Sequence, residues 1–390
     1  MKNEAAYWIA LAHLPKWSYS KINTLVVKFF YNEKITIDEF FNLPESIWSS
    51  IYQLDLLEIS DLQKAKSELP NIAFFAENLY NQGYEFIPIT SSEYSKTLKH
   101  NLKTALSPTL LYIKGNKQIL HEKSIAIVGS RAAQPNSLLF TDNIAKLASK
   151  DFKVVVSGFA KGVDKQALDS AIKYNGQSII VLPQGITTFN SGFKSYYKQI
   201  VDGDVLVLST FYPKSVWSAG LAMARNSIIY GLADEIFVAE SSEKGGTWSG
   251  VLDGLKKGRK IYVRKPDLSE KNANYILINK GAVAVDFNGI ETIYPENSEK
   301  LISKSNIEEQ LVPIVNISER ILNEFSDRPI TAKELILKLG LDWTPKKMTA
   351  QLRKMKEIKV LKKGRINQFI LKTNKYDQPT YSSTQVEIKF

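Results

Sequence analysis

Ile125-Ala-Ile-Val-Gly129-Ser130-Arg131 is the stretch of the sequence that decides the fold. Its four consecutive apolar residues are typical of a strand buried on both faces, as in a parallel sheet covered by helices. The residues that follow leave the carboxyl end of this strand and lead into an amphipathic stretch at 137–149. Ligands of open α/β sheets bind at this edge, where free backbone amides and helix starts attract anions. Gly129, Ser130 and Arg131 are therefore candidate anion-binding residues.

The same alternation of apolar strand and amphipathic helix extends from residue 106 to residue 294. It predicts an α/β domain with a doubly wound parallel sheet, of the extended Rossmann-like kind. The expected strands are 109–113, 124–128, 153–156, 178–182, 205–208, 235–239 and 260–263, and the expected helices are 137–149, 163–174, 190–202, 217–231 and 247–257.

The flanking segments have a different character. Residues 1–105 carry helical periodicity and predict a small helical domain similar to a sterile-alpha-motif (SAM-like) unit, with Asp38 and Ser60 as helix starts. The polar residues 295–316 predict a linker. Residues 317–372 predict a winged helix, because three helical stretches, one of them with a Thr331–Glu334 capping box, precede a two-stranded hairpin. Residues 373–390 are expected to form a loose tail.

Three further polar turns are expected at the same edge of the sheet. Two glycines, a hydroxyl group and a lysine follow the strand at 153–156, and Asp164 is expected to be stabilised there by a helix dipole rather than to act as a base. The other two polar turns are the Arg-Asn pair at 225–226 and the Gly-Gly-Thr turn at 245–247. If their cations converge, this edge would suit a phosphodiester chain. The candidate contacts are Gly129, Ser130, Arg131, Ser157, Gly158, Lys161, Gly162, Arg225, Asn226, Gly246 and Thr247.

A second basic site is expected in the predicted winged helix. Residues 344–365 hold nine Lys and Arg against Glu357 alone, a net charge of +8. Such a segment can neutralise phosphates, with its third helix directed toward a groove and its hairpin acting as the wing. A protein-binding role for this unit stays open. The candidate DNA contacts are Lys346, Lys347, Arg353, Lys354, Lys362, Lys363 and Arg365.

Composition narrows the possible functions. The 390 residues carry a formal net charge of +11, which allows a polyanionic partner. The absence of cysteine excludes disulfides, thiolate nucleophiles and cysteine-ligated metals. The three histidines, His13, His100 and His121, are far apart in sequence, so no metal site, cofactor or catalytic triad is expected. The sequence has no dinucleotide or P-loop fingerprint and no membrane span, and we expect a cytoplasmic protein.

The order of these motifs resembles the DNA-processing protein A family, also called Smf. The resemblance rests on five segments: 108–116, 125–131, 157–164, 224–231 and 258–263. It implies a non-enzymatic, dimeric binder of single-stranded DNA that protects incoming DNA and loads a RecA-type recombinase during natural transformation, the DNA uptake of competent cells. It also implies that the Gly-Ser-Arg, Ser-Gly-x-Ala-x-Gly and Arg-Asn motifs contact the DNA.

Two other functions stay open at this point. The same Rossmann variety resembles Lonely Guy phosphoribohydrolases, but Gly250 stands where those enzymes carry a glutamate, and hydrolysis needs that carboxylate. Alternatively, the winged helix could regulate transcription on duplex DNA while the central domain senses a nucleotide. A binder of single strands would prefer unpaired oligonucleotides, with Phe159 and Trp248 as candidate stacking platforms.

Overall fold

The computed structural model describes residues 4–267, 269–292, 321–325, 328–339, 344–355, 357–363 and 366–372. The chain forms two compact units, residues 1–298 and 299–390, which we describe separately. The linker expected at 295–316 and the tail expected at 373–390 lie outside the described residues.

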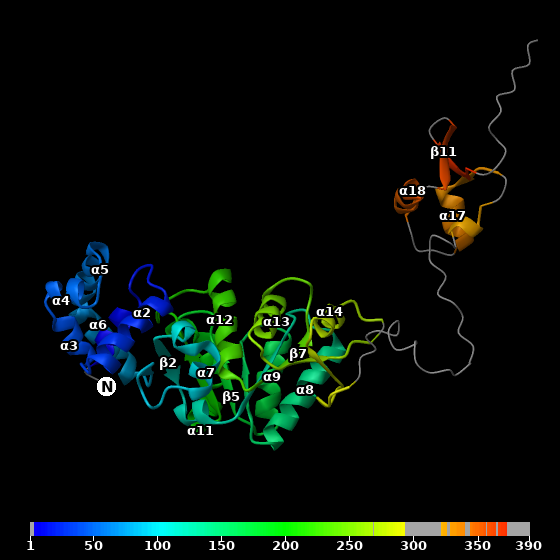
Figure 1. Cartoon of the computed structure of the whole chain (residues 1–390). Helices are drawn as coiled ribbons and strands as arrows, with labels where there is room; N and C mark the ends of the chain where they lie inside the picture. The colour runs from blue at the N-terminus through cyan, green and yellow to red at the C-terminus, as the bar shows by residue number, and fades with distance from the viewer. Residues whose placement is uncertain are drawn as a thin grey trace, which may run out of the picture. The chain divides into compact units, whose positions relative to one another are not determined.

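A nine-stranded, mostly parallel sheet organises the first unit, with the strand order β1-β2-β6-β5-β4-β3-β7-β8-β9 (Figure 1). All seven expected strands are present. The expected parallel arrangement is confirmed for the strands from β3 to β9, but not for β2, which pairs antiparallel with both β1 and β6. The strands are β1 (Glu85–Pro88), β2 (Leu110–Lys114), β3 (Ser124–Gly129), β4 (Val154–Ser157), β5 (Ser178–Val181), β6 (Val205–Ser209), β7 (Glu235–Glu240), β8 (Ile261–Arg264) and β9 (Val283–Val285).

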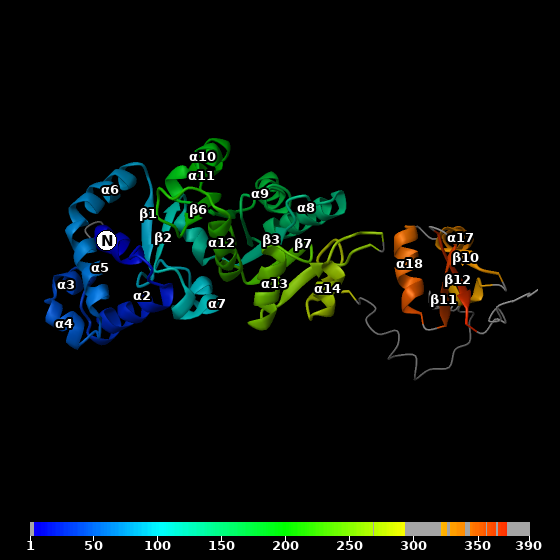
Figure 2. The ribbon, with the colours of Figure 1, turned by 90° about the horizontal axis from the view of Figure 1, so that it is seen from above.

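Helices cover both faces of the sheet, as the two views in Figures 1 and 2 show. Alternate residues of β3 explain the arrangement. Ile125 and Ile127 pack with Phe140 of α8, whereas Ala126 and Val128 belong to the cluster that contains Ile228 of α12. The helices are α7 (Lys96–Leu106), α8 (Pro135–Lys150), α9 (Val163–Lys173), α10 (Asn190–Ser195), α11 (Tyr197–Asp202), α12 (Ala219–Leu232), α13 (Gly246–Lys256) and α14 (Asn274–Asn279), with 3-10 turns η3 (Lys117–His121) and η4 (Ile186–Thr188).

The strand order reverses at β3, which has β4 on one side and β7 on the other. All three strands run parallel, so the loops that leave their carboxyl ends meet at one edge of the sheet. In open α/β sheets this reversal opens a crevice between the loops, and ligands bind there. The fold therefore places the candidate residues after β3, β4 and β7 around one position.

The N-terminal region is helical up to β1 and shares one hydrophobic cluster with the sheet. Helix starts at Asp38 and Ser60 were wrong predictions: Thr36 and Asp55 cap these helices in capping boxes, and Ser60 lies inside α5. The strand β1 was not predicted. The helices are α1 (Ala5–Ala12), α2 (Tyr19–Val26), the π-helix η2 (Val27–Asn32), α3 (Ile37–Asn42), α4 (Glu45–Ser50), α5 (Leu56–Ser67) and α6 (Leu69–Asn81).

Buried polar contacts fasten this helical region to the sheet. The Asn23 side-chain amide donates to the Ser107 carbonyl at 2.8 Å and accepts a hydrogen bond from the Thr109 hydroxyl at 2.8 Å. His13 lies 2.7 Å from the Tyr112 hydroxyl on β2, and burial lowers the pKa of His13 to about 4. The helical region and the sheet are thus joined by both apolar packing and satisfied polar groups.

The second unit contains a small antiparallel sheet, ordered β10-β12-β11, and its described residues include the helices α17 and α18. Leu335, Met348, Leu352 and Phe369 are fully buried in its core. The predicted capping box is present, since the Glu334 amide donates to the Thr331 hydroxyl at 3.3 Å and the Thr331 amide donates to the Glu334 carboxylate at 2.8 Å. The elements are β10 (Ile330–Thr331), α17 (Ala332–Leu339), α18 (Pro345–Lys354), β11 (Ile358–Lys363) and β12 (Ile366–Leu371).

Within the described part of the chain, no helix is both long and apolar enough to cross a bilayer. Nor do the described residues contain a group of three or more His, Cys, Asp or Glu arranged to hold a metal ion.

Candidate functional site

Two adjoining hollows open at the carboxyl edge of the sheet, and together we call them the rim groove. One, of about 460 Å³, is lined by the loops after β3 and β7 and by the start of α12. The other, of about 440 Å³, is lined by the loops after β4 and β5. They form one groove because six lining residues are common to both: Arg131, Ala132, Ala160, Trp217, Ala222 and Arg225.

The loop after β3 is held in place from both sides. The Thr247 hydroxyl donates to the Gly129 carbonyl at 3.2 Å, and the Val163 amide donates to the Ser130 carbonyl at 3.2 Å. The Ser130 hydroxyl accepts a hydrogen bond from the Ala132 amide at 3.1 Å. Arg131, which follows, is exposed and lines both hollows. The loop therefore presents a free guanidinium group from a fixed backbone.

The loop after β4 has a buried half and an exposed half. Ser157 is fully buried, and its hydroxyl donates to the Ile127 carbonyl at 2.7 Å. Gly162 has φ +80°, and a Cβ there would lie 2.4 Å from the Ser130 carbonyl oxygen, so the position requires glycine. Lys161 is exposed and lines the groove. Ser157, Gly158 and Gly162 thus shape the loop, and Lys161 is the predicted residue of this loop whose side chain reaches the groove.

Arg225 and Asp164 form a buried pair beneath the groove. Their side chains are 5% and 11% exposed, and the Arg225 Nη1 and Asp164 Oδ2 atoms are 3.7 Å apart. Nη1 also donates to the Val181 carbonyl at 3.3 Å, whereas the buried Nε has no hydrogen-bond partner. Burial raises the pKa of Asp164, and the charges of Arg225 and Arg131 and amide hydrogen bonds from the preceding loop oppose the rise. The Arg225 guanidinium is therefore ion-paired with Asp164 beneath the groove.

The loop after β7 brings a helix start to the groove. α13 begins at Gly246 without a side-chain cap, so its first amides remain available to an anion. A Cβ on Gly246 would lie 2.5 Å from the Asn226 side-chain nitrogen, which places the Arg-Asn motif of α12 directly against this helix start. Lys244 is exposed and also lines the groove.

The groove has an excess of positive charge. Arg131, Lys161 and Lys244 have no ion-pair partner among the residues that the structure describes. Asp164 is the carboxylate that lines the groove, and it is buried against Arg225. Cationic side chains and uncapped amides therefore face the same space, with the acidic group already neutralised.

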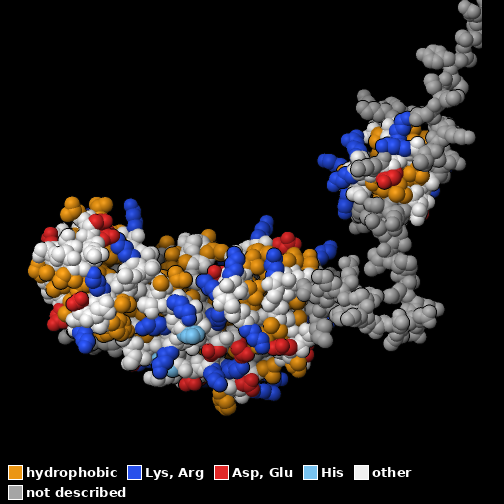
Figure 3. Space-filling view, in the orientation of Figure 1, with side chains coloured by type: hydrophobic (Ala, Val, Ile, Leu, Met, Phe, Trp, Pro, Cys, Tyr) orange, Lys and Arg blue, Asp and Glu red, His pale blue; other side chains and the backbone are white. Residues whose placement is uncertain are grey.

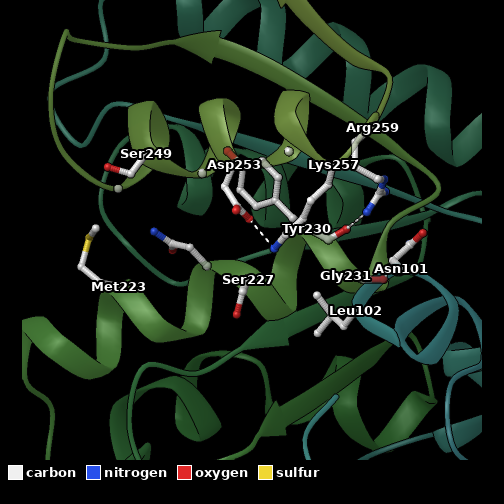
Figure 4. Close-up of a pocket in the computed structure, with 14 residues that line it drawn as sticks. Asn101, Leu102, Met223, Ser227, Tyr230, Gly231, Ser249, Asp253, Lys257 and Arg259 are labelled. Atoms are coloured by element: carbon white, nitrogen blue, oxygen red, sulfur yellow. Dashed lines mark hydrogen bonds and ion pairs between the residues drawn. The ribbon is translucent and has the colours of Figure 1, made fainter. Parts of the chain in front are cut away.

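A third hollow, of about 160 Å³, adjoins the rim groove between α7, α12 and α13 (Figure 4). In Figure 4, Asn101 and Leu102 of α7 face Tyr230 and Gly231 of α12. Both cationic side chains that line it, Lys257 and Arg259, already have partners within the protein. Lys257 pairs with Asp253 at 2.7 Å, and Arg259 donates to the carbonyls of Tyr230 and Ala233. This hollow is a weaker anion site than the rim groove for that reason.

The structure brings Arg131, Lys161 and Arg225 to one groove, with Gly129, Ser130, Asn226, Gly246 and Thr247 around it. Sequence reasoning missed two aromatic residues of the groove, Phe189 and Trp217. Phe159 lines the second hollow, where its ring meets that of Phe189 edge to face at 4.9 Å, whereas Trp248 is half-buried against the core and does not line the groove. The sequence signal for Trp217 is an aromatic residue directly before the Ser218 cap of α12, but its exposure follows only from the tertiary structure.

The second predicted site falls in the C-terminal unit. Lys346, Lys347, Arg353 and Lys354 are exposed on α18. Figure 3 shows Lys and Arg side chains gathered on the visible face of this unit. Arg365 lies outside the described residues, and the side chains of Lys362 and Lys363 are outside the description as well.

Comparisons with known proteins agree with this architecture. The model of a family described as DNA recombination-mediator protein A matches residues 85–294. DNA processing protein DprA of Streptococcus pneumoniae is 30% identical over 156 residues, which cover 40% of this chain and 55% of that protein. The DprA of Bacillus subtilis is 28% identical over 210 residues, or 52% of this chain and 69% of that protein.

A solved structure shares the fold. The X-ray structure of DprA from Streptococcus pneumoniae matches with a TM-score of 0.54 and 23% identity, covering 72% of this chain and 93% of that chain. The sequence match, by contrast, spans little more than half the length of the curated pneumococcal protein.

Proposed function

Because this chain belongs to the family of DNA recombination-mediator protein A, we propose that it binds single-stranded DNA in the rim groove. The phosphates would lie along Arg131, Lys161 and Lys244 and against the first amides of α13. Gly129, Ser130, Asn226, Gly246 and Thr247 would form the wall of the groove. Ser157, Gly158, Gly162 and Arg225 would hold the loop after β4 in shape from below.

One observation carries this proposal: Arg131, Lys161 and Lys244, which have no ion-pair partner within the described part of the chain, line the groove together with an uncapped helix start, and its carboxylate is already paired with Arg225. A polyanion gains favourable contacts there and meets no uncompensated negative charge within the described lining. The aromatic rings in the second hollow favour an unpaired strand, because only unstacked bases offer their faces to such rings.

The test is fluorescence anisotropy of the full chain with matched single-stranded and duplex oligonucleotides across a salt series. We expect tighter binding of the single strand. We expect Arg131→Ala to weaken that binding by about 1.5–3 kcal/mol, as for the loss of a hydrogen bond to a charged group. It should also lower the slope of log affinity against log salt by about 0.7, the share of one phosphate contact on a single strand.

Lys123→Ala is the matched control. Lys123 is exposed and precedes β3. Lys123→Ala therefore removes one positive charge, as Arg131→Ala does, but at the opposite end of β3. It should leave both the affinity and the salt slope unchanged. Preference for duplex, or equal effects of the two substitutions, would contradict the proposal.

The wider role that we propose follows from the family. The chain would protect incoming single-stranded DNA, act as a homodimer and load a RecA-type recombinase during natural transformation. Its N-terminal helical region (1–105) would be SAM-like, its central region (106–294) Rossmann-like and its C-terminal unit (317–372) a winged helix. Support for the last comes from the two helices and the β11–β12 hairpin packed on one core.

We propose a binding role without catalysis. The phosphoribohydrolase alternative needs a glutamate at position 250, where this chain has glycine. A Cβ at Gly250 would lie 2.9 Å from the Tyr230 ring, so a glutamate would not fit there without a shift of α12 or α13. Asp164, the carboxylate that lines the groove, is committed to Arg225. Neither position supplies the free carboxylate that glycosidic hydrolysis requires.

A further inference from the structure

Trp217 differs from the other tryptophans that the structure describes. Its side chain is 53% exposed, whereas Trp8 and Trp48 are buried and Trp17 and Trp248 are half-buried. No hydrogen bond, ring contact or ion pair within the described residues involves the Trp217 side chain. Leaving a large aromatic ring in water forfeits the stabilisation that its burial would bring. The ring is therefore available to a partner.

The position of Trp217 indicates which partner. It is one of the six residues that line both hollows of the rim groove. On one side lie the uncapped amides of α13, and on the other lie Phe159, Phe189 and Lys161. A strand whose phosphates follow the polar hollow would therefore bring its bases within reach of this ring.

The backbone around Trp217 is fixed even though the side chain is free. The Gly185 amide donates to the Ser215 carbonyl at 2.8 Å, and the Thr187 hydroxyl donates to the Pro213 carbonyl at 2.6 Å. Directly after Trp217, the Ser218 hydroxyl caps α12 by accepting from the Leu221 amide at 3.2 Å. Because the loop is already ordered, binding a ligand costs little backbone conformational entropy there.

We propose that Trp217 is a stacking platform for one nucleobase of the strand bound in the rim groove. This inference rests on the proposed function and adds a base contact to its phosphate contacts. The contact needs an unpaired base and accepts any of the four, because every base has a π face. It therefore contributes selectivity for single strands with little dependence on sequence.

The experiment uses the full chain and oligothymidylate. Trp217→Ala should raise the dissociation constant roughly 5-fold to 150-fold, the range found when one base–aromatic stack is removed. The salt slope should not change, since no charge is removed. Trp217→Phe keeps a ring and should stay within about 3-fold of the unsubstituted chain, while losing most of the quenching of tryptophan fluorescence that DNA causes.

Tyr197→Ala is the matched control, since Tyr197 is an aromatic residue of α11 that is 69% exposed and does not line the groove. Its affinity for oligothymidylate should equal that of the unsubstituted chain. A second measurement compares normal and abasic strands on the same protein, so each protein serves as its own reference. With an abasic oligonucleotide of the same length, the unsubstituted chain should bind more weakly, and Trp217→Ala should cause no further loss.

Two outcomes would overturn the inference in distinguishable ways. If Arg131→Ala weakens binding while Trp217→Ala does not, the phosphate groove stands and the stacking platform fails. If neither substitution weakens binding, the proposed function fails with it. An equal effect of Trp217→Ala on normal and abasic strands would also contradict stacking, because the ring would then act without a base.

Discussion

Gly158 is the residue with the least room around it in the candidate site. A Cβ there would lie 1.6 Å from the Arg225 Nη1 atom and 2.4 Å from the Asp164 Oδ2 atom. Both of those groups are buried, so the added methyl group of Gly158→Ala would displace the pair. We expect a loss of about 1–3 kcal/mol in the free energy of unfolding, as for other overpacked interiors, measured by urea denaturation.

Gly220→Ala is the control for this substitution. A Cβ at Gly220 would have only the Ser218 hydroxyl nearby, at 3.9 Å, and the position is helical, so alanine should be neutral or stabilising by about 0.5–1 kcal/mol. Equal stability of Gly158→Ala and the unsubstituted chain would mean that the pair beneath the groove adapts freely.

Glu270 gives a pH-dependent prediction. Burial alone would raise the pKa of Glu270, but hydrogen bonds from Arg264 and Asn136 and the charge of Arg264 outweigh it and lower the pKa from 4.5 to about 2. The stabilisation is therefore fully present above pH 4.5 and is lost as the pH falls toward 2. Glu270→Gln should destabilise the fold by about 3–5 kcal/mol at pH 7, because Arg264 is fully buried.

Thermal unfolding of the unsubstituted chain and of Glu270→Gln between pH 7 and pH 3 checks the predicted pH dependence. The gap in Tm between Glu270→Gln and the unsubstituted chain should stay constant down to about pH 4.5 and then narrow. Glu291→Gln, which removes an exposed partner of Lys260, should shift stability by at most about 1 kcal/mol. A gap that persists unchanged to pH 3 would show that ionised Glu270 is not the source of the stabilisation.

Residue types in loops were predictable, but the directions of their side chains were not. Gly129, Arg131 and Lys161 stand where the motifs placed them, at the groove. Ser157 has the same hydroxyl and a similar loop position as Ser130, yet it is buried and bonded to β3. Only the packing of neighbouring strands decides which of two loop hydroxyls faces a ligand. Trp217 was missed for the same reason, since its exposure depends on tertiary structure.

At the scale of elements, long apolar runs were the dependable signal. Seven of the nine strands were predicted, including four-residue strands such as β4, whereas β1, with Glu85 and Pro88 at its ends, and the three-residue strand β9 were not. The direction of β2 could not be read from its sequence, because an antiparallel strand that is buried on both faces has the same apolar run as a parallel one. Both wrong helix starts are polar residues that resemble a cap in the sequence but lie within a helix: Asp38 is in the first turn of α3, and Ser60 is further inside α5.

Helix α18 carries the prediction for the second basic site. Replacing Lys346, Lys347, Arg353 and Lys354 together with Gln removes four exposed charges and leaves the buried Met348 and Leu352 in place. If α18 binds duplex DNA, the slope of log affinity against log salt for duplex should fall by up to about 0.9 for each phosphate that these side chains neutralise. Fluorescence anisotropy of the full chain with duplex DNA across a salt series measures this slope.

Single-stranded binding serves as the internal control for that experiment, because the rim groove is unaltered and should retain its affinity. Unchanged duplex binding would move the C-terminal unit from a DNA-binding to a protein-binding role. A loss on a single specific duplex sequence would instead favour the regulator alternative.

At the scale of the whole molecule, each of the two units has a hydrophobic core of its own. In the first unit, one apolar cluster extends from the N-terminal helices to the strands, so the helical region does not have a separate core. The sequence predicted the change from helical to alternating character but not this continuity. Periodicity reports which face of an element is apolar, and it does not report which neighbour covers that face.

The reversal of strand order at β3 also has a consequence for synthesis on the ribosome. β3 gains one neighbour from β4 soon after both emerge, but its other neighbour, β7, follows roughly a hundred residues later. Until then, β3, an interior strand of the finished sheet, is an open edge that can pair with another nascent chain. Any chain that terminates before Glu235 keeps that edge permanently, so premature termination there yields an aggregation-prone fragment rather than a smaller working protein.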